Sequence, residues 1–155
     1  MGFNKFVTGL GKLTDSDAEF VSKLKQYLYP ILGCCFEVHK EMGPFLNEYM
    51  YQDALDICLE ENGFTAENKI REFRFHATFH DKIIQHPHRM DFLVNQNVII
   101  ECKAVQSIST EHRQQLWNYM RLSGIRIGIL YNFAPIKDQY EKYYFDPEQQ
   151  RIFLF

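Results

Sequence analysis

The sequence lacks the features of a membrane-spanning chain. No hydrophobic run approaches the roughly 20 residues that cross a bilayer. The longest uncharged stretch near the start, residues 27–36, is interrupted by Pro30 and Gly33. The N-terminus also lacks the layout of a secretory signal peptide. We therefore expect a cytoplasmic protein that does not use a membrane.

The spacing of the cysteines excludes the common zinc-binding patterns. The four cysteines form neither a CxxC pair nor a zinc-finger spacing; they are Cys34, Cys35, Cys58 and Cys102. Four of the six histidines fall within residues 76–88, but their spacing also matches no common zinc-ligand pattern. We expect reduced, mostly buried thiols, as in cytosolic proteins.

An excess of positive charge is missing too. The 17 Lys and Arg residues against 20 Asp and Glu residues leave a net charge of −3. This balance argues against a mainly electrostatic nucleic-acid binder, but it permits a local basic groove beside an acidic metal site. With 155 residues, 46% of them hydrophobic, the chain has the size and composition of one folded domain over 1–155.

The hydrophobic pattern predicts helices first and strands afterwards. Asp15 or Ser16 is a candidate cap for a first helix. Pro30 either kinks this helix or begins a new one, and the helical pattern ends at Gly43. The later predicted elements are a helix at about 48–62, strands at 70–79, 83–94, 98–105 and 125–131, and a helix between Ser109 and Gly124. This order predicts an α/β (α+β) fold with a sheet flanked by helices.

The end of the chain predicts a β-hairpin. Segments 143–145 and 152–155 are apolar and flank a turn at residues 146–148. Its aromatic side chains make this hairpin a candidate homodimer interface; they are Tyr143, Tyr144, Phe145, Phe153 and Phe155.

Two charged residues interrupt the apolar strand predicted at 98–105. Alternation along a strand puts Glu101 and Lys103 on one face, and Cys102 on the other. Charges within an apolar strand are costly to bury without partners. A salt bridge at the end of the strand is one explanation, and a functional site is the other.

Asp91 favours the functional site. If residues 95–97 form a three-residue turn, Val94 pairs with Val98, and the same register puts Asp91 opposite Glu101. Two facing carboxylates repel unless a proton or a cation lies between them. Mg²⁺ binds through one or two carboxylates together with substrate phosphate. The pattern therefore predicts a metal site with the Lys103 ammonium beside it.

Asp91 followed by Glu101-Cys102-Lys103 resembles the Asp…(Asp/Glu)-x-Lys motif of the PD-(D/E)XK nuclease superfamily. Within it, the chain is similar to the bacterial GxxExxY proteins over residues 27–133. The matching stretches are 33–44, 48–51, 89–94, 101–105, 112–119 and 124–133. Two positions depart from the pattern: Phe45 replaces the glycine that precedes Glu48 by three residues, and Met90 replaces the nominal proline before Asp91.

This resemblance implies a restriction-endonuclease-like αβββαβ core with a mixed central sheet, an extra N-terminal helix and a C-terminal β-hairpin. It also implies that Asp91 and Glu101 hold Mg²⁺ or Mn²⁺, helped by the backbone carbonyl of Cys102. Lys103 would orient or activate the attacking water. Glu48 would be an outer metal ligand; its alternative role is that of an acid favoured by the helix dipole.

The segment after the motif adds candidates for catalysis and binding. Gln115 and Tyr119 resemble the Q-x-x-x-Y element of some superfamily branches, and both can equally be core groups. Segment 69–90 carries a surplus of three positive charges, from which we take nucleic-acid-binding candidates: Arg71, Arg74, Lys82 and Arg89. We expect a metal-dependent nuclease acting on nucleic acid, with DNA favoured over RNA. The alternative is a catalytically silent nuclease-fold module that binds nucleic acid or protein.

Overall fold

The computed structural model describes residues 11–13 and 17–155, so the predicted cap at Asp15 or Ser16 lies outside the described residues. The helices are α2 (Ala18–Met42), α3 (Glu48–Glu61) and α4 (Thr110–Ser123). The strands are β1 (Gly11–Lys12), β2 (Lys69–Phe75), β3 (Thr78–Phe79), β4 (Lys82–Ile83), β5 (His88–Val94), β6 (Val98–Lys103), β7 (Ile127–Asn132), β8 (Gln139–Asp146) and β9 (Arg151–Leu154).

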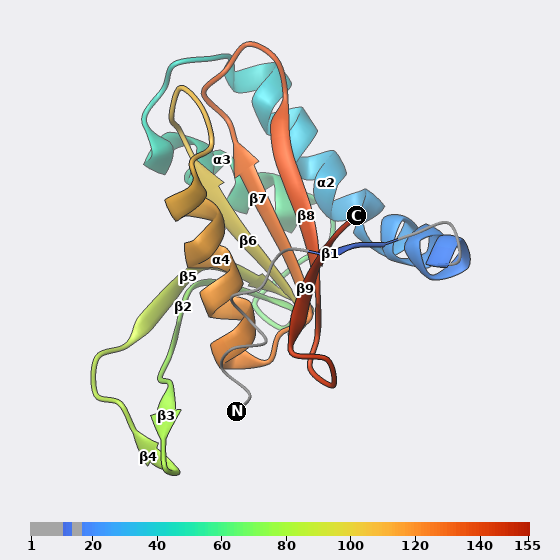
Figure 1. Cartoon of the computed structure of the whole chain (residues 1–155). Coiled ribbons are helices and arrows are strands. Elements are labelled where there is room, and N and C mark those ends of the chain that lie inside the picture. Colours follow the sequence, from blue (N-terminus) through green and yellow to red (C-terminus); the bar gives the residue numbers. More distant parts are fainter. Residues whose placement is uncertain (1–10, 14–16) are drawn as a thin grey trace.

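Seven strands form one mixed sheet in the order β1-β9-β8-β7-β6-β5-β2. The β6–β7 and β1–β9 pairs are parallel, and the other pairs are antiparallel. Helices α2 and α3 cover one face, and α4 covers the other (Figure 1). The series α3-β2-β5-β6-α4-β7 confirms the predicted αβββαβ core, with α2 as the extra helix and β8–β9 as the C-terminal hairpin.

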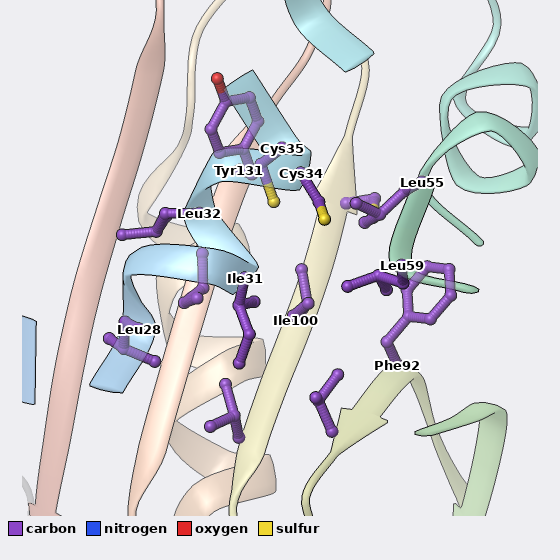
Figure 2. Packing of buried hydrophobic residues seen from close by; sticks show 14 of the residues in the cluster. Leu28, Ile31, Leu32, Cys34, Cys35, Leu55, Leu59, Phe92, Ile100 and Tyr131 are labelled. Atoms are coloured by element: carbon purple, nitrogen blue, oxygen red, sulfur yellow. The ribbon is translucent and has the colours of Figure 1, made fainter. Parts of the chain in front are cut away.

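Alternation along β6 divides the core into two clusters. Ile100 and Cys102 pack with residues of α2 and α3, whereas Ile99 packs with residues of α4. Figure 2 shows side chains of both α2 and α3 converging on Ile100. Helix α4 lies so close to β7 that a Cβ on Gly128 would be 2.6 Å from the Met120 sulfur. In its apolar half, β6 is therefore covered on one face by α2 and α3 and on the other by α4.

Pro30 lies inside a continuous α2, so of the two predicted alternatives the new helix is excluded. Two other local predictions are corrected by the structure. The predicted strand 83–94 is divided, because Pro87 cannot donate a ladder hydrogen bond. Its first part belongs to the separate β3–β4 hairpin, which projects from the sheet beyond α4 (Figure 1). In the C-terminal hairpin, Tyr143 and Phe145 are buried in the core, so these two rings are not available as an interface.

The four cysteines are free thiols, and all four are buried, as predicted. In the described part of the chain, no helix is both long enough and apolar enough to cross a membrane.

Candidate active site

Strand β6 pairs with β7 along its whole length but with β5 along only part of its length. It pairs with β7 over its whole length, from Val98 to Lys103. Its pairing with β5 stops after Val94↔Val98, Leu93↔Ile99 and Phe92↔Ile100. This confirms the register predicted from the turn at residues 95–97. It also leaves the last backbone groups of β6 without regular partners in β5.

The two acidic side chains replace the missing backbone pairing. The backbone N–H of Asp91 donates to Glu101 Oε1 at 3.0 Å, and the backbone N–H of Cys102 donates to Asp91 Oδ2 at 2.8 Å. Each carboxylate is thus held by the opposite strand. This exchange places the two acids side by side at the point where the strands part.

The side chains of strand β5 change faces at Asp91, where the neighbouring strand β2 also has an irregular residue. Glu72 has a left-handed backbone, with φ of 57°, and lies between the Arg71↔Phe92 and Phe73↔Met90 pairs. On one side of this position, Phe92 packs with α2 and α3; on the other, Met90 packs with α4. The side chains of β5 therefore change faces at Asp91, so this residue belongs to neither apolar cluster.

Burial gives both acids a raised pKa. Glu101 is 3% exposed, and burial is the main reason that its pKa lies well above the ordinary range, with the charge of Asp91 adding to the effect. Burial also raises the pKa of Asp91, against the opposing effects of the Cys102 N–H and the Lys103 charge. A second negative charge is therefore disfavoured here without a cation.

Helix α4 brings the predicted polar partners to the same place. The Ser109 side chain caps the helix by accepting the His112 N–H at 3.3 Å, and the His112 ring accepts the Ser109 N–H in return. One turn later, Gln115 Oε1 accepts a hydrogen bond from Lys103 Nζ at 3.1 Å. Burial raises the pKa of Tyr119, and the nearby negative charges of Glu101 and Asp91 raise it further.

Glu48 approaches Asp91 and Lys103 from the face of the sheet that α2 and α3 cover. It is the first residue of α3 and accepts a hydrogen bond from Gln52 Nε2 at 3.2 Å. Burial raises its pKa, the Asp91 charge raises it further, and the Lys103 charge opposes both effects. Glu48 thus belongs electrostatically to the same site as Asp91 and Lys103.

The donor set fits a hard divalent cation. Carboxylate oxygens are the ligands that Mg²⁺ and Mn²⁺ prefer, and Mg²⁺ commonly keeps several water ligands. Within residues 11–13 and 17–155, no group of three or more His, Cys, Asp or Glu side chains is arranged to hold a metal ion. Asp91 and Glu101 would therefore bind one together with water, backbone or substrate oxygens.

The predicted basic residues do not all reach this site. Arg71 Nη1 lies 2.6 Å from Asp53 Oδ1 of α3, so its charge is paired away from the cluster. Arg89 precedes Asp91 by two residues, and its charge opposes the raised pKa values of Asp91 and Tyr119; its Nη1 also lies 3.9 Å from Glu72 Oε1. Arg74 pairs with Arg89 across the β2–β5 ladder, and Lys82 is exposed in the β3–β4 hairpin.

Asn132, which was not predicted as a functional residue, holds the backbone that follows Lys103. It is fully buried; its Oδ1 accepts the Val105 N–H at 3.0 Å, and its Nδ2 donates to the Val105 carbonyl at 2.9 Å. The Phe133 N–H also donates to the Lys103 carbonyl at 2.8 Å. The signal for Asn132 was a polar residue directly after the apolar run 125–131.

A family model described as the PD-(D/E)XK nuclease superfamily matches residues 25–143, which include the whole cluster. The chain therefore belongs to the PD-(D/E)XK nuclease superfamily, whose members generally hydrolyse phosphodiester bonds. Among solved structures, the crystal structure of SSO0001 is similar, with a TM-score of 0.47 and 20% sequence identity. The similarity covers 61% of this chain and 48% of that one, so this chain spans about half the length of SSO0001. No curated protein sequence matches this chain.

Proposed function

We propose that this protein is a metal-dependent nuclease of the GxxExxY branch, with DNA favoured over RNA as the substrate class. The observation that carries the proposal is the exchange of hydrogen bonds between Asp91 and Glu101 at the opened edge of β6. It holds the buried Glu101 and the partly buried Asp91 together beside an ammonium group, where a cation would offset their charge.

In this proposal, Asp91 and Glu101 hold Mg²⁺ or Mn²⁺ with the backbone carbonyl of Cys102, and Glu48 is an outer ligand. The bound ion supplies Lewis-acid stabilisation of the scissile phosphate. The Lys103 ammonium positions the attacking water and offsets negative charge that develops on the phosphate oxygens. Gln115 holds the Lys103 amine through its 3.1 Å hydrogen bond, which limits the positions that the amine can take.

Nucleic acid would reach the site along β5 and the β3–β4 hairpin. Arg89 lies beside the acids, Arg74 is its cross-strand neighbour, and Lys82 extends the positive charge outward. Arg71 contributes less in this account because Asp53 already pairs with it. Tyr119 is only 8% exposed and packs in the apolar cluster under α4, so we assign it no contact with nucleic acid. Phosphate contacts of this kind predict binding that weakens as salt rises.

The second candidate is a silent module that recognises nucleic acid or a protein partner through the same scaffold. This candidate predicts binding without cleavage under every metal condition.

A substrate panel separates the two candidates. Supercoiled plasmid, linear duplex DNA, single-stranded DNA and RNA would be incubated with Mg²⁺ or Mn²⁺ and either the wild type or Asp91→Asn. The asparagine keeps an oxygen that can accept the Cys102 N–H, so the fold should persist while cleavage is lost. Glu19→Gln is the matched control, since this exposed carboxylate lies on the first turn of α2. Equal cleavage by Asp91→Asn and the wild type would refute the mechanism.

A further inference from the structure

Phe45 combines a strained backbone with an exposed ring. Its φ is 67°, in the left-handed region that bulky residues rarely adopt. Its side chain is 76% exposed, so burial of the ring explains little of why this conformation is kept. Strain of this kind persists where the surroundings enforce it, and it occurs often at functional sites.

The surroundings of Phe45 enforce the conformation from both sides. The Phe45 N–H donates to the Ala134 carbonyl at 3.1 Å. The hydroxyl of the fully buried Tyr51 accepts the Leu46 N–H at 3.0 Å and donates to the Gly43 carbonyl at 2.7 Å. The loop between α2 and α3 is thus fixed, and the Phe45 ring projects from a rigid support.

Phe45 lines a pocket next to the candidate active site. The pocket has a volume of about 690 Å³ and is formed by residues 45–47, 104–106 and 134–136. Asn47 directly precedes Glu48, and Ala104 directly follows Lys103. In Figure 1, the loop between α2 and α3 lies at the same end of the sheet as the ends of β6 and β7. Ile136, which is 77% exposed, provides a second apolar wall.

The lining suits a nucleobase rather than a phosphate. None of the nine lining side chains is charged; the polar ones are the amides of Asn47 and Gln106, which can pair with base edges. The positive charges of Lys103 and Arg89 lie instead at the acids. Every base has a π-face that stacks on an aromatic ring regardless of sequence. The charged residues beside the acids therefore suit a phosphate, and the adjoining uncharged pocket suits a base.

We propose that Phe45 stacks on the nucleobase next to the scissile phosphate, so that this pocket is a base-binding subsite. The inference rests on the proposed nuclease function for the identity of its ligand. The Phe45 ring would contact an unpaired base, not the phosphate backbone. It therefore predicts tighter binding of single-stranded or locally opened nucleic acid than of an intact duplex.

The test compares a labelled oligothymidylate with an all-abasic strand of the same length, by fluorescence anisotropy. Glu101→Gln serves as the background, so that cleavage does not interfere. Phe45→Gly and Phe45→Ala should each weaken oligothymidylate binding about tenfold, the size expected from loss of one base stack. They should leave binding of the abasic strand unchanged, and Phe45→Tyr should retain both affinities. Tyr29→Ala, at a 79% exposed aromatic of α2, is the matched control.

The glycine variant protects the test against misfolding. Glycine adopts a φ of 67° without strain, so the melting temperature of Phe45→Gly should not fall. Equal weakening for both strands, or no weakening for either, would overturn the base-binding subsite. Failure of the proposed function is a separate outcome: the wild type would then cut no substrate, whatever the effect of Phe45 on binding.

Discussion

The two edges of β6 show how one strand serves both stability and chemistry. Toward β7, backbone pairing continues through Lys103, whereas toward β5 it ends at Ile100. The first half of the strand is apolar and covered on both faces. The second half places a carboxylate and an ammonium group where the neighbouring strand turns away. A strand held along one edge can thus leave its other edge open for a polar site.

This comparison assigns different roles to neighbouring residues. Ile100 belongs to the covered half, and its contribution is packing. Glu101 follows it directly, yet its burial makes ionisation costly, which disfavours the metal-free fold at neutral pH. Substitutions on the two sides of this boundary should therefore separate activity from stability.

The largest effect is expected from Lys103→Met. Methionine retains much of the apolar side chain but removes the ammonium that lies beside the acids. Metal-dependent cleavage should fall about 1000-fold, in the range measured when one electrostatic group is removed from an active site. Single-turnover cleavage measures the effect, with Lys23→Met at an exposed position of α2 as the control. A loss equal in both variants would contradict the role given to Lys103.

The next largest effect is expected from Ile100→Ala, on the covered half of β6. Ile100 is fully buried, so the truncation should lower the free energy of unfolding by about 3 kcal/mol. Urea denaturation measures this change. The folded variant should still bind Mn²⁺, because the carboxylates of Asp91 and Glu101 are unchanged. Loss of metal binding by the folded variant would show that the packing of the apolar half of β6 and the metal site at its other half are not independent.

Gln115→Ala should have a smaller effect, about a tenfold fall in cleavage rate. The alanine removes the oxygen that accepts the Lys103 hydrogen bond but leaves the amine itself. Gln115→Glu keeps an acceptor at this position and should recover most of the rate. Equal rates for Gln115→Ala and the wild type would exclude the positioning role.

The smallest effect is expected on the stability of the metal-free protein. The folded state raises the pKa of Glu101 above its ordinary value of 4.5, so the folded protein retains a proton that the unfolded chain releases. Stability is therefore lost as pH rises above that ordinary value. Glu101→Gln lacks this titration, so it should gain stability over the wild type as pH rises and show no such gain at acid pH. Thermal unfolding in EDTA across this range measures the difference. A variant advantage confined to acid pH would reverse the sign and contradict the account.

Much of the site was predictable because it depends on local register. The turn at residues 95–97 sets the Val94↔Val98 pair, and the alternation of β6 then separates Glu101 from Ile100. The cap at Ser109 likewise sets the phase of α4 and so the position of Gln115. These features follow from short-range geometry, which the pattern of residue types records directly.

The remaining features depend on contacts between distant segments. The pattern does not show that Asp91 and Glu101 accept each other's backbone hydrogen bonds, because this requires β5 and β6 to part. The left-handed backbones of Glu72 and Phe45 are equally invisible, since neither residue type favours that conformation. The pairing of Arg71 with Asp53 depends on how α3 lies against β2. Such features are set by packing of whole elements.

The most direct test of the central claim is calorimetric titration of Mn²⁺ into the wild type and into Asp91→Asn at neutral pH. The account predicts saturable binding to the wild type and its loss in the folded variant. Equal binding to both proteins, or no binding to the wild type, would contradict the claim that these two carboxylates form a metal site.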